Sequence, residues 1–361
     1  MGKPIRVGLI GLGRAGYGMH RIELGRRPDK FQFVAVCDEI EERTKAFADE
    51  FGSRTYTRVE DLIADPEVEM VTVATRSCDH YRHAVMALEA GKDVLIEKPF
   101  GIRLEQAQRL IELGSQPAGP HIYTRHNRRF ERGFELVNQI IDSGKLGEVY
   151  EIRLARNEYN RRYDWQTLLE YAGGHLFNWG SHIIDHALRF CGGDYKDLYT
   201  NIKHVVAAGN CEDHAKLVFT GINNRIVDME ISYGVALPTP EYIVYGTRGT
   251  MVGGGRNLHL RYLDPDHLPE PIEADRETPP AGCDALNPGS ARVSRNPEVL
   301  VWKEEDVAID FDGTERMWDA LYDAIRNGVP YPVTLEQAAK VIEVIDKAKA
   351  GTVFENVEFD L

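Results

Sequence analysis

The sequence of 361 residues has few cysteines, and they form no recognisable group. Its five cysteines are scattered along the chain, without a C-x-x-C pair or a His/Cys set at metal-ligand spacing: Cys37, Cys78, Cys191, Cys211 and Cys283. Structural zinc sites and redox pairs need such spacings. We therefore expect neither a metal site nor a disulfide framework.

Concentrated positive charge and long apolar runs are also missing. Lys and Arg number 43 against 57 Asp and Glu, which gives a formal net charge of −14. A nucleic acid or an anionic membrane surface attracts basic patches, so we expect neither as a partner. No apolar run approaches the length of a membrane span, and no signal peptide precedes the first predicted strand. These absences predict a cytoplasmic globular protein.

The first 38 residues contain a glycine-rich turn between two apolar runs. The apolar run 5–10 leads into the turn Gly11-Leu12-Gly13-Arg14-Ala15-Gly16, and a second apolar run ends before Asp38. This order predicts strand, glycine turn, helix and strand, which is a nucleotide-binding βαβ unit. Gly11 allows the tight turn, Gly13 the approach of a pyrophosphate, and Gly16 close packing of the helix on the strand.

Two further features of this unit indicate which nucleotide it binds. The helix that follows the turn offers free N–H groups and a positive dipole end to phosphates. Asp38 is placed to accept hydrogen bonds from a ribose diol, and its carboxylate would repel a 2′-phosphate. The unit therefore favours NAD(H) over the phosphorylated cofactor.

The rest of the chain divides into two patterns. Strands and helices alternate up to residue 126, which predicts an α/β domain with a doubly wound parallel sheet at residues 1–126. Strands dominate residues 127–361 and predict an α+β domain with a mostly antiparallel sheet. Residues 264–297 predict a long irregular loop, either a lid or interface arm or a solvated insertion. Two amphipathic helices at 314–327 and 335–350 end the chain and could pack back on the first domain.

A first candidate for chemistry follows the short apolar strand 94–96. Glu97, Lys98 and Pro99 stand at its carboxyl end, where ligands bind to a doubly wound sheet. The Lys98 ammonium can polarise a carbonyl or hydroxyl oxygen, and Glu97 could accept a hydrogen bond from the ribose beside a nicotinamide. The alternative is a surface ion pair at a strand end, and we favour the functional interpretation.

A second candidate follows the double glycine at 173–174. Asn178 and His182 are four residues apart, so they share one face of the predicted helix, while Ser181 and Asp185 share the neighbouring one. His182 is the natural general acid or base, because the ordinary pKa of histidine lies near working pH. A lone histidine is more often structural, but a polar amide on the same face favours function.

Taken together, these motifs resemble the Gfo/Idh/MocA oxidoreductase family. The match also includes Ala74-Thr75, His80 and Asn127-Arg128-Arg129-Phe130, and it extends to the last helices. The resemblance implies a Rossmann domain, then an α+β domain with an open, mostly antiparallel sheet used for oligomerisation, so a homodimer or homotetramer. It implies NAD(P)-dependent oxidation or reduction of a sugar or cyclitol. The implied catalytic residues are Lys98, His182 and Asn178, and the implied cofactor contacts are Gly11, Gly13, Arg14, Ala15, Gly16, Asp38, Ala74, Thr75, His80, Glu97, Lys98 and Asn127.

The chain departs from the family pattern at two positions. The family usually has Asp where this chain has Asn178, and an amide cannot accept a proton at neutral pH. Proton transfer should then fall on His182, with Lys98 as electrostatic support. Arg76 stands where the family often has Pro, so this turn could contact the cofactor or substrate differently.

Substrate recognition has only one sequence candidate, the polar and aromatic segment before the double glycine. It contains Tyr159, Arg161, Arg162, Tyr163 and Trp165. Aromatic faces stack on sugar rings and arginines donate to hydroxyls or carboxylates, so we expect Tyr159, Arg161 and Trp165, with Lys98, Asn178 and His182, to bind the substrate. A surface loop with solvated arginines explains the segment equally well.

The sequence thus predicts an NAD(H)-dependent dehydrogenase for a secondary alcohol of a sugar, sugar derivative or inositol. Two alternatives stay open. One is an elimination-type glycoside-cleaving enzyme, in which NAD is reduced and reoxidised without net turnover. The other is a non-catalytic sensor of a dinucleotide and a sugar, against which the presence of both Lys98 and His182 argues.

Overall fold

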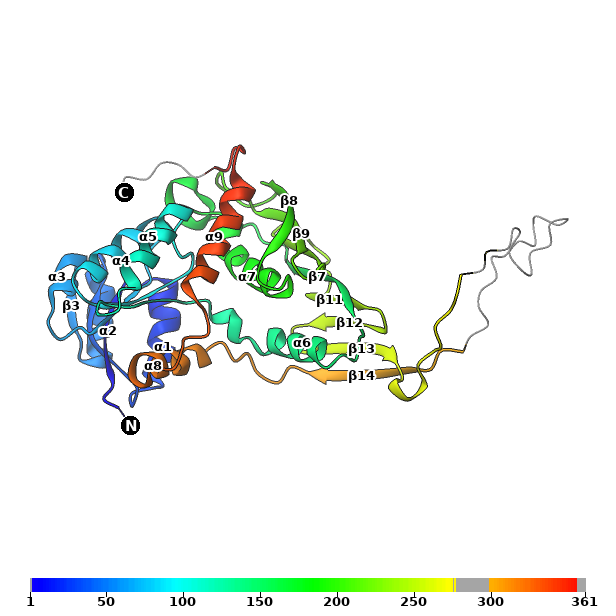
Figure 1. Ribbon diagram of the computed structural model, residues 1–361. Coiled ribbons are helices and arrows are strands. Elements are labelled where there is room, and N and C mark those ends of the chain that lie inside the picture. The colour runs from blue at the N-terminus through cyan, green and yellow to red at the C-terminus, as the bar shows by residue number, and fades with distance from the viewer. Residues whose placement is uncertain (1, 275, 277–298, 356–361) are drawn as a thin grey trace.

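The computed structural model describes residues 2–274, 276 and 299–355. Two β-sheets lie side by side, with helices between and around them (Figure 1). The predicted loop at 264–297 lies mostly outside the described residues, which include the short helix η7 (Pro265–His267) at its start.

The first sheet is parallel and has the strand order β3-β2-β1-β4-β5-β6. This order places a switch point between β1 and β4, where a doubly wound sheet binds ligands at its carboxyl edge. Its strands are β1 (Ile5–Ile10), β2 (Phe31–Cys37), β3 (Arg54–Tyr56), β4 (Met70–Val73), β5 (Asp93–Ile96) and β6 (Ile122–Thr124).

Helices cover both faces of this sheet, because its strands are apolar on both sides. The helices around it are η1 (Gly16–His20), α1 (Arg21–Gly25), α2 (Glu41–Phe51), α3 (Val59–Ala64), η2 (Ser77–Asp79), α4 (His80–Glu89) and α5 (Leu104–Gly114). Helix α8 (Arg316–Asn327) packs on the same face as α1 and α2, although it comes near the end of the chain.

The second sheet has the order β14-β13-β12-β11-β7-β10-β9-β8. It is mostly antiparallel, with one parallel pair between β7 and β10. Buried side chains alternate with more exposed ones along β9, which indicates one covered and one open face. The strands are β7 (Val149–Asn157), β8 (Tyr195–Lys203), β9 (His214–Gly221), β10 (Ile226–Ser232), β11 (Tyr242–Gly246), β12 (Gly249–Gly254), β13 (Asn257–Leu263) and β14 (Trp302–Ala308).

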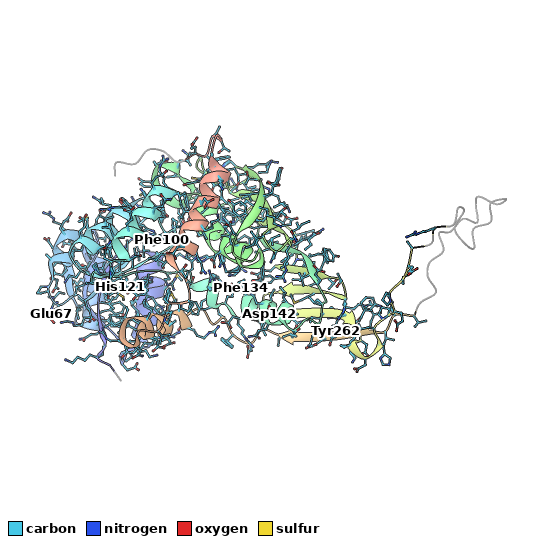
Figure 2. All side chains as sticks on the ribbon, viewed as in Figure 1. Glu67, Phe100, His121, Phe134, Asp142 and Tyr262 are labelled. Carbon is cyan, nitrogen blue, oxygen red and sulfur yellow. The ribbon has the colours of Figure 1, made fainter. Side chains whose placement is uncertain are left out.

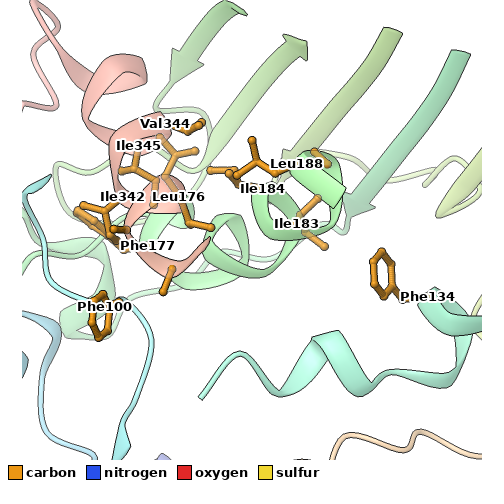
Figure 3. Packing of buried hydrophobic residues seen from close by; sticks show 14 of the residues in the cluster. Phe100, Phe134, Leu176, Phe177, Ile183, Ile184, Leu188, Ile342, Val344 and Ile345 are labelled. Carbon is orange, nitrogen blue, oxygen red and sulfur yellow. The ribbon is translucent and has the colours of Figure 1, made fainter. Parts of the chain in front are cut away.

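Helices η6 (Leu176–Gly180), α7 (Ser181–Phe190) and α9 (Leu335–Lys349) contact strands of the second sheet. The other helices of this part of the chain are η3 (Asn127–Phe130), α6 (Arg132–Asp142), η4 (Trp165–Thr167) and η5 (Leu169–Tyr171). Helix α9 contacts both α5 and α7. In the close view, Ile184 of α7 points toward Ile345 and Ile342 of α9, and Ile183 lies on the side of α7 nearer Phe134 (Figure 3).

One apolar cluster therefore runs from the first sheet into the second. It includes Phe100, which lies toward the first sheet, and Phe134, which lies beside the second (Figure 2). The cluster holds the carboxyl edge of the first sheet against the amino end of α7, and the candidate site lies where these two meet.

Candidate active site

The glycine turn after β1 has the shape that a dinucleotide needs. Gly11 has φ +90°, and a Cβ there would lie 2.6 Å from the carbonyl oxygen of Ala74, while a Cβ on Gly16 would overlap the carbonyl oxygen of Gly11. A Cβ on Gly13 would instead meet no atom within 4 Å. An open pocket of about 520 Å³ adjoins this turn, lined by Leu12, Gly13, Arg14, Tyr17, Gly18, Glu42, Arg43 and Ala46. The residues present fit a nucleotide whose phosphates approach the backbone at Gly13.

Asp38 follows β2 and faces the same turn. Its Oδ2 accepts the N–H of Leu12 at 2.7 Å, and its Oδ1 accepts the N–H of Ile40 at 3.0 Å. Arg43 Nη1 lies 3.6 Å from Oδ1. The carboxylate thus holds the glycine turn against the end of β2, and it keeps lone pairs for a ribose because each oxygen can accept more than one hydrogen bond.

His80 ties together two loops at the carboxyl edge. Its Nδ1 lies 3.2 Å from the carbonyl oxygen of Pro99, and its Nε2 lies 3.2 Å from that of Thr75. The ring is 2% exposed, and burial lowers its pKa, so the neutral ring donates to one of these oxygens at a time. Thr75 Oγ1 in turn lies 3.2 Å from His83 Nδ1. This linkage fixes the loop after β4, which begins at Ala74, against the loop after β5.

Glu97 belongs to a buried network of charges behind this edge. Its Oε1 lies 2.9 Å from His20 Nε2 and accepts from Arg125 Nη1 at 3.1 Å. Arg125 also binds Glu23 at 2.6 Å, and Glu23 accepts from Trp318 Nε1 of α8. Arg125 and His20 hold the pKa of Glu97 well below its usual value against the opposing effect of burial. The other oxygen, Oε2, accepts the backbone N–H of Lys98 at 3.3 Å.

Lys98, in the loop after β5, binds a residue of η6. Its Nζ donates to the backbone oxygen of Asn178 at 3.0 Å and to Asn178 Oδ1 at 3.1 Å. An ammonium has three hydrogens, so one is left for a substrate oxygen. Burial lowers the pKa of Lys98 to about 8; the charge of Glu97 opposes this shift, and Arg162 and Arg14 add to it.

His182 lies one helical turn after Asn178, on the same side of the helix. It is 8% exposed, and its Nδ1 is buried without a hydrogen-bond partner among the described residues. The ring centroid lies 6.1 Å from that of Trp179 and 6.2 Å from that of His126. Burial and then the charge of Lys98 lower the pKa of His182 well below its ordinary value, so the ring is neutral at pH 7. Asp185 does not orient it, because that carboxylate binds Arg129 at 2.5 Å.

Residues 159–165, which the sequence suggested for substrate binding, include both exposed side chains and side chains that point inward. Tyr159 is 58% exposed and Arg161 is also exposed, whereas Trp165 is partly buried. Arg162 is the inward arginine: its Nη1 donates to Tyr233 Oη at 3.1 Å. Tyr233 Oη also accepts from Asn178 Nδ2 at 3.0 Å, so Arg162 adjoins the Lys98 contact and Arg161 does not take part in it.

Several residues near the site had no prominence in the sequence. Arg125 and His126 directly precede Asn127, which is 6% exposed at the start of η3. These three polar residues follow β6 at the carboxyl edge of the first sheet, where ligands bind, so their position in the sequence could have indicated a role in the site. Tyr233 follows β10 and had no such signal, because its partners are distant in sequence.

Two models of one family match the chain. The model described as the oxidoreductase family with an NAD-binding Rossmann fold matches residues 5–117, and the GFO/IDH/MocA C-terminal domain model matches residues 134–252. The chain belongs to the Gfo/Idh/MocA family. The predicted family and fold class are thereby confirmed, and so is NAD as the cofactor.

Known proteins are similar to this Gfo/Idh/MocA chain along most of its length. It is 28% identical over 291 residues to the uncharacterized oxidoreductase YhhX of Escherichia coli (strain K12), which covers 80% of each chain. It is 25% identical over 350 residues to the scyllo-inositol 2-dehydrogenase (NADP(+)) IolW of Bacillus subtilis (strain 168), covering 95% of this chain and 92% of that one. The crystal structure of an oxidoreductase from Bacillus cereus has the same fold, with a TM-score of 0.78 at 21% identity over 96% of this chain and 97% of that one.

The described residues also settle two smaller points. None of their helices is long and apolar enough to cross a membrane. Among them, no three His, Cys, Asp or Glu side chains gather in a way that could hold a metal ion.

Proposed function

We propose that this protein is an NAD(H)-dependent dehydrogenase that interconverts a secondary alcohol and a ketone on a sugar, sugar derivative or inositol. The observation that carries the proposal is the contact between Lys98, in the loop after β5, and Asn178 of η6, which leads directly into α7 with His182. A bound nicotinamide supplies or takes up the hydride. The residues of this chain must then bind the substrate oxygen and manage its proton.

Lys98 is the group whose pKa best suits it to accept and return the proton of the substrate hydroxyl. Its pKa of about 8 lets both of its protonation states exist near working pH, whereas the lowered pKa of His182 makes that ring a weak base. We therefore assign the proton to Lys98 Nζ, and to neutral His182 a hydrogen bond to the substrate oxygen. This reverses the roles that the sequence suggested.

The proposed substrate class draws on the named activity of one relative, the scyllo-inositol 2-dehydrogenase IolW. That relative uses NADP(+), whereas Asp38 of this chain would repel a 2′-phosphate, so we propose a preference for NAD(H). The preference is measured as the ratio of kcat/KM values for the two cofactors.

The test is a screen for net NAD reduction over inositols, aldoses and glycosides, followed by Lys98→Met and His182→Asn. Each variant should lose about 10²-fold or more in kcat, and Lys45→Met, at an exposed position, should lose none. Because neutral Lys98 accepts the proton, alcohol oxidation should rise with pH through about 8, and ketone reduction should fall.

The alternatives predict other outcomes of the same screen. Glycoside cleavage without accumulation of NADH would indicate the elimination mechanism, and tight NAD binding without any turnover would indicate a sensor. Full activity of both site variants would contradict the assignment of the site itself.

A further inference from the structure

A line of side-chain hydrogen bonds leads away from Lys98. Lys98 Nζ donates to Asn178 Oδ1, Asn178 Nδ2 donates to Tyr233 Oη at 3.0 Å, and Arg162 Nη1 donates to the same Tyr233 oxygen at 3.1 Å. The four side chains come from four separate segments: the loop after β5, η6, the end of β10 and the loop after β7. The line thus depends on tertiary structure alone.

Among these hydrogen-bonded side chains, the amide of Asn178 could face either way, because its shape alone does not decide its orientation. Its oxygen and nitrogen ends have nearly the same size, so only their partners decide which end faces which way. The Lys98 ammonium has no lone pair and can only donate, so it needs the oxygen. Tyr233 Oη accepts a hydrogen bond from Asn178 Nδ2, so Asn178 Oδ1 faces Lys98.

We propose that Tyr233 and Arg162 are positioning residues of the reaction, which orient Asn178 so that it fixes the Lys98 ammonium at the reacting oxygen. The inference rests on the proposed function, since it assigns Lys98 to that oxygen. Neither residue needs to touch the substrate. Tyr233 acts through the amide, and Arg162 acts both through the amide and through its charge on Lys98.

Both residues are themselves firmly held. Tyr233 is 4% exposed, and its ring centroid lies 3.8 Å from that of His175. The Arg162 side chain binds Asp164 through both Nε and Nη2 at 2.9 Å and also contacts Gln166. A guanidinium fixed by a carboxylate fork keeps its remaining N–H aimed in one direction. Here that direction is the Tyr233 oxygen.

Arg162 differs from Tyr233 because it also brings charge. The charged side chains that act on Lys98 are Glu97, which favours the ammonium, and Arg162, Arg14 and Arg125, which oppose it. The histidines that feel the charge of Lys98 (His80, His126, His175 and His182) all have lowered pKa values and are neutral at pH 7. Removing the charge of Arg162 should therefore raise the pKa of Lys98, and removing the Tyr233 hydroxyl should not.

The first test is Tyr233→Phe with Tyr242→Phe as the matched control. Tyr242 is 1% exposed, and its hydroxyl has no partner among the described residues, so its removal breaks no such line. Tyr233→Phe should lower kcat about tenfold or more with the KM for NAD unchanged, because the ammonium is misplaced rather than lost. Tyr242→Phe should stay within about twofold of wild type. A Tyr233→Phe enzyme with wild-type kcat would overturn the proposal.

The second test measures Lys98 directly and needs no substrate. The rate at which acetic anhydride labels Lys98, followed by peptide mass spectrometry across pH, reports the pKa of its amine. The midpoint should lie near 8 in wild type and in Tyr233→Phe, move upward in Arg162→Gln, and return in Arg162→Lys. An unchanged midpoint in Arg162→Gln would contradict the inference. If the screen finds no turnover, the proposed function fails, while these midpoints still decide the role of Arg162.

Discussion

Gly13 and Gly16 stand three residues apart in one turn, yet their surroundings differ. A side chain at Gly16 would overlap the backbone of Gly11, so this glycine is required by the fold. A side chain at Gly13 would project into open space beside the pocket, so nothing in the protein requires a glycine there. The requirement at Gly13 comes from the cofactor, which must approach the backbone.

This contrast gives a prediction for two alanine variants. Gly13→Ala should keep the wild-type free energy of unfolding but bind NAD at least about tenfold more weakly, because the methyl group occupies the place of the pyrophosphate. Gly16→Ala should lose about 2 kcal/mol or more of stability through overpacking. Urea unfolding and calorimetric titration with NADH measure the two quantities. A Gly13→Ala protein with unchanged NADH affinity would show that the pyrophosphate lies elsewhere.

Single residues also show where sequence reasoning stops. Lys98, Asn178 and His182 could be selected because each follows a recognisable strand end or glycine pair. Arg161 and Arg162 could not be distinguished, since a loop has no period that says which side chain points inward. The network in which Glu23 binds Arg125 and Trp318 could not be predicted either, because Glu23 lies 102 residues from Arg125 and 295 residues from Trp318.

At the scale of elements, the start of the helix that bears Asn178 and His182 is held by a buried carboxylate. Glu212 Oε1 accepts the N–H of Leu176 at 3.1 Å, and Glu212 Oε2 lies 3.3 Å from Lys349 Nζ at the end of α9. Gly174 has φ +115°, and a Cβ there would overlap the carboxylate. The double glycine therefore leaves room for this cap.

Glu212 should be important for stability through its oxygen at the helix start. Glu212→Ala leaves the buried Leu176 N–H without its acceptor and should cost about 1–3 kcal/mol in urea unfolding. Glu212→Gln keeps an oxygen at the same place and should cost less. Equal losses in the two variants would mean that the charge facing Lys349, and not the cap, is what matters.

Elements were predicted from sequence where their pattern was strong. The alternation of strands and helices up to residue 126 was readable, and it ends just after β6. Strands were expected to dominate residues 127–361, but β12, β13 and β14 were not located individually. β12 contains three glycines, which weaken a strand pattern, and β14 is an edge strand with mostly exposed side chains, so neither shows a clean apolar period.

At the scale of the whole molecule, the chain returns to its first sheet near its end. Met317, Trp318, Leu321 and Tyr322 of α8 pack in one cluster with apolar side chains of β1 and β2. Arg326 of α8 also binds Glu69 at 2.5 Å. Sequence suggested only that the last helices could pack back, because amphipathicity shows that a face is buried without showing against what.

This return of the chain predicts that residues 1–126 do not form a stable domain by themselves. Without α8, the fragment loses part of the apolar cluster that buries Ile5, Val7 and Phe31, which are at most 4% exposed in the whole chain. Each such side chain contributes about 1.5–3 kcal/mol when fully buried, so the fragment should bind a hydrophobic dye and lack a sharp thermal transition. In the full chain, Trp318→Ala should cost about 3–5 kcal/mol. A fragment that melted cooperatively at the temperature of the full chain would show instead that residues 1–126 fold stably without α8.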